Sequence, residues 1–225
     1  MPRRPSFGSG GLVFHVLNRG VRRMTLFETP TDYYAFLTIL GRAERKTSVS
    51  LFAYCLMSNH FHLVVRPLSD SDLSKFMFWV GMLHSQRWHA THRTRGTGPV
   101  YQGRFKAIPV AAGAHFFRVC RYVERNPLRA RLVTQAEHWP WSSLSQRAGL
   151  RRPVRLDPWP VPMPVDWVNS VNGETASETD DIRRAVGRGA PYGPAGWREQ
   201  MGSRLQLTGR LHPMGRPKTK PGVLS

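Results

Sequence analysis

The chain is poor in cysteine and lacks long apolar runs. Its 225 residues include two cysteines, Cys55 and Cys120, which form no C-x-x-C pair, so neither a zinc knuckle nor a redox motif is indicated. Both lie in apolar stretches, and we expect them to be small core residues. No segment approaches the roughly 18 apolar residues of a membrane-spanning helix, and no apolar run follows the basic start as in a signal peptide. The sequence predicts a cytoplasmic protein with no membrane partner.

Acidic residues are also scarce, which leaves a large positive charge. Lys and Arg number 33 against 14 Asp and Glu, giving a net charge of +19. A surplus of this size indicates an anionic partner and says little about the fold. Most of the positive charge comes from arginine, whose guanidinium donates two hydrogen bonds to a phosphate and stacks on bases. Nucleic acid is therefore favoured over a membrane surface. The alternative is a compositional bias of the genome without a specific partner.

The hydrophobic periodicity predicts alternating strands and helices over the first 150 residues. The expected elements are a strand at 11–20, a helix at 31–45, strands at 49–57 and 60–67, a long helix at 69–94, a strand at 105–110 and a helix ending at Asn126 before Pro127. This order predicts an α+β domain with a ferredoxin-like antiparallel sheet and helices packed on it.

Past residue 150 the composition changes. Five prolines occur in the 17 residues 151–167, which is typical of an extended connector. One short helix is expected within 191–207, and the basic, Pro/Gly-rich stretch 209–225 is expected to be disordered. We therefore predict two parts, a folded domain over 1–150 and an extended, basic C-terminal extension over 151–225 that is partly disordered.

Two histidines lie on one face of the predicted strand at 60–67. Side chains alternate along a strand, so His60 and His62 point the same way while Phe61 supplies the core. Two imidazoles about 6–7 Å apart can converge on one first-row divalent ion. The alternative is a pair of ordinary core or surface histidines. We interpret His15 as a packing residue of its own strand.

A tyrosine and an asparagine share one face of the helix that ends at Pro127. Tyr122 and Asn126 are one turn apart, whereas Phe116, Cys120 and Val123 form the apolar face on the other side. A tyrosine that avoids the core face, with an amide oxygen one turn away, indicates a nucleophile beside a metal ligand. The alternative is a half-exposed tyrosine and an asparagine that ends a helix.

Five motifs occur together in a fixed order. They are FHVLNRG (14–20), YCLMSNHFHLVVRP (54–67), GPVYQGRFKAIPV (98–110), RYVERNPLRARLV (121–133) and WPWSSL (139–144). Over residues 11–150 the chain resembles the single-tyrosine HUH transposases, in particular the REP-associated tyrosine transposases. The fold that the resemblance implies is the HUH endonuclease fold.

The resemblance also implies a mechanism. His60 and His62 form the HUH motif, which holds a divalent metal ion, Mg²⁺ or Mn²⁺. Tyr122 is the nucleophile that forms a 5′-phosphotyrosine and frees a 3′-OH. Asn126 stands where the third ligand is expected, although many relatives carry glutamine there. The implied substrate is single-stranded DNA beside a palindromic hairpin, and we expect a monomer rather than a dimer.

Several basic residues are candidates for DNA contacts. They are Arg19, Arg22, Arg104, Lys106, Arg118 and Arg125. Three other functions stay open from the sequence. A rolling-circle or relaxase-type HUH nickase would use the same chemistry, and a regulator derived from a transposase would bind DNA without cutting it. A structural zinc protein would need a closing ligand that no cysteine pair supplies.

Overall fold

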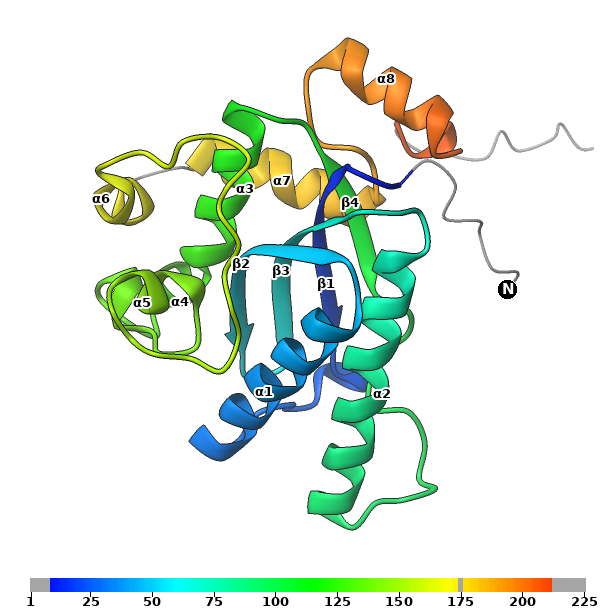
Figure 1. Cartoon of the computed structure of the whole chain (residues 1–225), viewed down its shortest axis with the longest axis vertical. Helices are drawn as coiled ribbons and strands as arrows, with labels where there is room; N and C mark the ends of the chain where they lie inside the picture. The colour runs from blue at the N-terminus through cyan, green and yellow to red at the C-terminus, as the bar shows by residue number, and fades with distance from the viewer. Residues whose placement is uncertain (1–8, 174–175, 212–225) are drawn as a thin grey trace, which may run out of the picture.

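A computed structural model describes residues 9–173 and 176–211, and its centre is a four-stranded antiparallel sheet. The strands are β1 (Val13–Arg19), β2 (Val49–Met57), β3 (His60–Pro67) and β4 (Lys106–Val110), in the order β2-β3-β1-β4 (Figure 1). A two-residue turn joins β2 to β3, with Met57 opposite His60. The predicted hairpin and the predicted α+β fold with an antiparallel sheet are confirmed.

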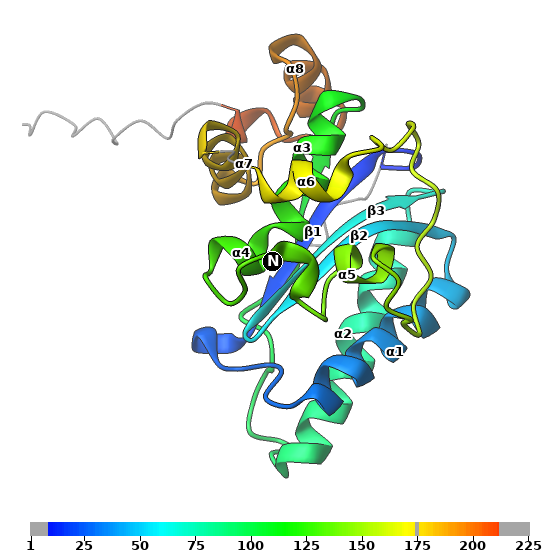
Figure 2. The ribbon, with the colours of Figure 1, turned by 90° about the vertical axis from the view of Figure 1, so that its left-hand side faces the viewer.

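Helices cover both faces of the sheet. They are α1 (Pro30–Lys46), α2 (Asp72–His92), α3 (Ala114–Glu124), α4 (Asn126–Arg129), α5 (Ser143–Arg147), α6 (Trp167–Asn172), α7 (Ala176–Arg188) and α8 (Ala195–Arg204). Short 3₁₀ helices lie at Val21–Arg23, Ala136–His138 and Thr208–Arg210. Figure 2 shows α1 and α2 on one side of the sheet and α3, α6 and α7 on the other.

The alternation along β3 separates two cores. Phe61, Leu63 and Val65 point into the core under α1 and α2. Val64 points the other way, into the core under α3. His60 and His62 share the face of Val64, as the sequence pattern predicts, and the structure shows that α3 covers this face. Cys55 and Cys120 are buried and free in this second core, which confirms their expected role.

The chain beyond residue 150 contributes to the second core. No helix or strand lies over 151–166, in agreement with the expected connector, but α6 and α7 were not predicted. Trp167, Val171 and Ile182 from these helices are buried against α3. The pattern missed α7 because its sequence is mostly polar and offers few apolar residues. The expected disorder at 209–225 falls, from residue 212 onward, outside the described residues.

Within the described part of the chain, no helix is long and apolar enough to cross a membrane.

Candidate active site

Three histidine rings meet on the sheet face beneath α3. β1 and β3 are adjacent, with Leu17 opposite His62 and His15 opposite Val64, so His15 sits diagonally across from His62. His15 Nε2 lies 2.9 Å from His62 Nδ1, and the two rings stack with centroids 5.1 Å apart. The His60 ring is perpendicular to that of His62, with centroids 5.0 Å apart. The predicted pair is therefore a cluster of three.

The cluster is neutral at physiological pH. Burial, followed by the charges of His15 and His60, holds the pKa of His62 well below its usual 6.5. Burial and the neighbouring Arg19 lower the pKa of His60 to about 4. Burial and Arg129 lower the pKa of His15 to about 3. Because ring nitrogens bind metals only when they carry no proton, these low pKa values keep the lone pairs of the cluster available.

Tyr122 lies directly against the histidines. Its ring meets those of His62 and His15 edge-on, with centroids 5.9 Å and 5.8 Å away. The expectation that Tyr122 avoids the core face is wrong, because its side chain is buried and belongs to the second core. The pattern failed here because α3 is covered by the sheet on one side and by α6 and α7 on another, so more than one stripe is buried.

Asn126 completes the group one turn after Tyr122. Its side-chain Nδ2 donates to the backbone oxygens of Tyr122 at 3.0 Å and Val123 at 3.4 Å. The amide thus uses its nitrogen for the helix backbone, and its oxygen Oδ1 faces other partners. The Arg129 guanidinium donates to this oxygen, and its carbon lies 4.4 Å from the Tyr122 ring centroid.

Arg129 and His15 were both missed from the sequence. His15 reaches the site only because β1 pairs with β3, and no local pattern reports that pairing. Arg129 follows Asn126 by three residues, a spacing that places the two side chains near each other on a helix. That spacing was the available signal for Arg129.

The donor set suits a divalent cation. His62 Nδ1 is engaged by His15, and His60 Nδ1 lies 2.7 Å from Asn59 Oδ1, so each ring has Nε2 left for a ligand bond. Two neutral imidazoles and the Asn126 amide oxygen form a mixed nitrogen and oxygen donor set, which suits a first-row divalent ion better than an ion that takes only oxygen ligands. Within 9–173 and 176–211, no three His, Cys, Asp or Glu side chains are placed to hold a metal.

The six candidate DNA contacts occupy three places. Arg19 ends β1 opposite His60, and Arg22 is exposed in the turn that follows. Arg104 and Lys106 are exposed at the start of β4. Arg118 and Arg125 instead face the C-terminal helices: Arg118 pairs with Glu178 at 3.1 Å, and Arg125 donates to the Val171 oxygen at 2.7 Å. The structure thus brings Arg19 to the histidines and gives Arg125 an anchoring contact with α6.

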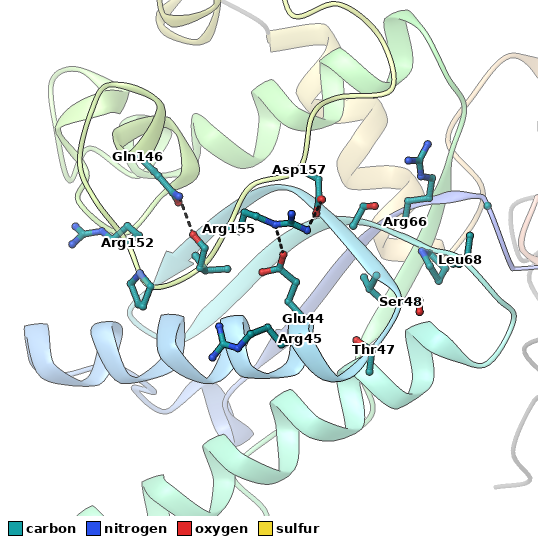
Figure 3. Close-up of a pocket in the computed structure, with 16 residues that line it drawn as sticks. Glu44, Arg45, Thr47, Ser48, Arg66, Leu68, Gln146, Arg152, Arg155 and Asp157 are labelled. Carbon is teal, nitrogen blue, oxygen red and sulfur yellow. Dashed lines mark hydrogen bonds and ion pairs between the residues drawn. The ribbon is translucent and has the colours of Figure 1, made fainter.

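A wide pocket lies away from this site. It has a volume of about 1040 Å³ and is formed by the C-terminal end of α1, the outer ends of β2 and β3, and the segment 146–157 (Figure 3). Arg155 bridges Glu44 at 3.2 Å and Asp157 at 3.1 Å across it. Asp157 in turn exchanges two 2.9 Å bonds with the Leu51 backbone on edge strand β2. The charges of Glu44, Arg155 and Asp157 are thus paired with one another, and Asp157 covers the edge of β2. We assign no ligand to this pocket.

Comparison with known proteins agrees with this architecture. The family model described as "Transposase IS200 like" matches residues 10–126, more than half of the chain. The chain belongs to the IS200-like transposase family. A solved structure described as "Structure of the REP associates tyrosine transposase bound to a REP hairpin" is similar in fold, with a TM-score of 0.53 and 19% identity over 70% of this chain and 92% of that chain. No curated protein matches.

Proposed function

We propose that the protein cuts and rejoins single-stranded DNA beside palindromic hairpins, with Tyr122 as the nucleophile. The observation that carries this proposal is the Tyr122 ring packed against the neutral, buried His62 ring at 5.9 Å. Membership of a transposase family supports strand transfer as the reaction class. The hairpin substrate is supported by the similarity to a transposase whose solved complex contains a REP hairpin.

The reaction divides into two phosphoryl transfers. The Tyr122 oxygen loses its proton and bonds to phosphorus, the bond from phosphorus to the 3′ oxygen breaks, and that oxygen gains a proton. In the second transfer a 3′-OH loses its proton and bonds to phosphorus, the bond from phosphorus to the Tyr122 oxygen breaks, and that oxygen regains a proton. One phosphodiester is thus restored for the one that was cut, and no nucleotide cofactor is consumed.

Four side chains have assigned roles. Mg²⁺ or Mn²⁺, when bound by His60, His62 and Asn126, would offset the charge of the scissile phosphate. Arg129 places a positive charge beside both the Tyr122 ring and Asn126, where it stabilises developing negative charge on the phosphate oxygens. The Arg129 guanidinium uses one of the two lone pairs of Asn126 Oδ1, so a bound ion would either share this oxygen with Arg129 or displace it.

The site is complete within one chain, which supports the proposal of a monomer. Tyr122 of α3 meets His15 of β1 and His62 of β3 in the same polypeptide. No residue from a second copy is needed to bring nucleophile and histidines together.

The test is a search for the covalent intermediate. Purified protein and Mn²⁺ are incubated with labelled single-stranded DNA that carries a palindromic repeat and its flanks, beside Tyr122→Phe and His60→Ala. We expect a denaturation-resistant protein–DNA adduct with the parent and none with either variant. An adduct that persists in Tyr122→Phe would assign the nucleophile elsewhere and reject the proposed role.

A non-catalytic DNA-binding protein is the second candidate. It is favoured by one contact, because the Arg129 guanidinium already occupies the Asn126 oxygen that a metal would need. Tight, hairpin-dependent binding without any adduct, across several repeats and in both metals, would favour this candidate over the nuclease.

A further inference from the structure

The C-terminal helices build a second concave surface beside α3. The segment after α7 runs along edge strand β4: Tyr192 N donates to the Pro109 oxygen at 2.8 Å, and Ala111 N donates to the Tyr192 oxygen at 2.9 Å. These bonds hold α7 and α8 at the edge of the sheet on the side of α3 (Figures 1 and 2). The surface therefore combines α3, the helix that carries Tyr122, with residues beyond 126, where the match to the family model ends.

This surface contains a pocket of about 440 Å³ that is rich in arginine. Four guanidinium groups line it against a single carboxylate, that of Asp181, and they belong to Arg118, Arg184, Arg188 and Arg198. We call these the tail-pocket arginines. Arg184 is paired with Asp181, and Arg118 with Glu178.

The remaining two tail-pocket arginines have uncommitted charges. The side chains of Arg188 and Arg198 are exposed and make no ion pair or hydrogen bond with residues in the described ranges. Two unpaired guanidinium groups that line one pocket attract an anion that can bind to both of them. A phosphodiester suits them because each guanidinium can donate two parallel hydrogen bonds to phosphate oxygens. The pocket is thus suited to a nucleic-acid backbone.

The pocket is next to the proposed cutting site. Arg118 precedes Tyr122 by four residues on α3, which is about 6 Å along a helix axis. Lys106, on the strand beside the histidine face, lies with its Nζ 3.4 Å from the Val186 oxygen of α7. Lys106 is opposite Leu17, and Leu17 is opposite His62. Lys106 therefore places one positive charge on β4, between the neutral histidines and the pocket.

We propose that the tail-pocket arginines bind backbone phosphates of the single-stranded DNA flank that adjoins the cleaved position. This inference rests on the proposed function, because it takes the same DNA as partner. The flank is favoured over the hairpin stem because phosphates near Tyr122 in space belong to the strand that Tyr122 cuts. The proposal gives the C-terminal extension a direct part in substrate binding.

The experiment measures equilibrium binding without cutting. Tyr122→Phe protein, with a chelator present, is titrated with a labelled hairpin that carries both flanks, at several salt concentrations. The double variant Arg188→Gln/Arg198→Gln is compared with its parent. Losing two phosphate contacts should lower the slope of log affinity against log salt by about 1.4, since each contact contributes roughly 0.7 on single strands. At about 0.1 M salt this corresponds to a roughly 25-fold loss of affinity.

The matched control is Arg183→Gln, which removes one positive charge from the same helix. Arg183 pairs with Asp180 and does not line the pocket. It should leave the slope unchanged, and on a hairpin without flanks the double variant should bind as its parent does. An unchanged slope and affinity in the double variant, while the parent binds tightly, would overturn this inference and leave the proposed function intact. Absence of binding by the parent would reject both.

Discussion

At the scale of single residues, His15 controls where His62 carries its proton. For His62 Nε2 to serve as a ligand, its proton must lie on Nδ1 and be donated to His15 Nε2. His15 must then carry its own proton on Nδ1, which is buried and has no partner among the described residues. A buried donor without a partner costs about 1–3 kcal/mol, so this is the cost of the tautomer in which His62 Nε2 can bind a metal.

The first prediction concerns this hydrogen bond. His15→Phe keeps a stacked ring and removes the acceptor, and we expect Mn²⁺ affinity to fall by about 10- to 100-fold, as for other partners of metal-bound histidines. His15→Gln places an acceptor near the former Nε2 and should recover most of the affinity. Titration calorimetry with the metal alone measures both.

The control for His15 is another buried histidine. His84 is bonded to the Tyr101 hydroxyl at 2.6 Å and belongs to α2, on the opposite face of the sheet. His84→Gln should alter stability and leave metal affinity unchanged. Equal losses of affinity in His15→Phe and His15→Gln would show that ring packing, and not the hydrogen bond, supports the site.

At the scale of elements, α3 is fixed by a buried carboxylate. Glu124, two residues after Tyr122, accepts from Trp167 Nε1 at 2.6 Å, from Arg147 Nε at 3.3 Å and from the Ser143 hydroxyl. Ser143 and Arg147 also bond to β2, because the Ser143 oxygen accepts from Tyr54 N at 3.0 Å and Arg147 donates to the Phe52 oxygen at 2.5 Å. The tyrosine helix is thereby tied to the sheet and to α6 at one point.

The second prediction tests the link to α6. Trp167→Phe keeps the buried ring but leaves a Glu124 oxygen without its donor, which should destabilise the fold by about 1–3 kcal/mol. Urea unfolding measures the loss. Trp79→Phe, a matched change on the opposite face of the sheet, should cost less. A Trp167→Phe protein as stable as the parent would show that the hydrogen bond from Trp167 to Glu124 does not help to hold α3.

Much of this architecture could be predicted from the sequence. The strands at 49–57 and 60–67 and the helix before Pro127 follow from alternation, a two-residue turn and a helix-breaking proline, all of which are local signals. His60 and His62 were found on the correct face for the same reason. His15 and the burial of Tyr122 depend on pairing between distant strands and on cover from α6 and α7, which no local pattern contains.

At the scale of the whole molecule, buried neutral histidines make the fold sensitive to acid. Burial lowers the pKa of His84 to about 4 and that of His15 to about 3. The folded state thus binds fewer protons than the unfolded state between these values and 6.5. Stability is complete above pH 6.5 and is lost as pH falls through this window. Lowering the pKa of His84 from 6.5 to about 4 contributes about 3 kcal/mol to this pH-dependent stability.

The third prediction follows from that sign. The urea midpoint should fall steadily between pH 7 and pH 4.5, and His84→Gln should show a shallower decline because one proton-linked group is gone. Circular dichroism across the pH range measures both proteins. Parallel curves for parent and variant would mean that His84 does not titrate differently in the folded and unfolded states.

The anchoring of α3 by its own C-terminal helices has a genetic consequence. Arg121 and Arg118 pair with Glu178 of α7. If two copies of the chain exchanged α3, the helix that carries Tyr122, each copy would have to break these ion pairs. Two defective alleles in one cell, one encoding His60→Ala and the other Tyr122→Phe, should therefore fail to complement each other. An excision assay with both alleles co-expressed measures this, and restored activity would mean that nucleophile and histidines can be supplied by separate chains. A gene copy that encodes either defect is therefore expected to stay inactive whatever other defective copy the cell contains.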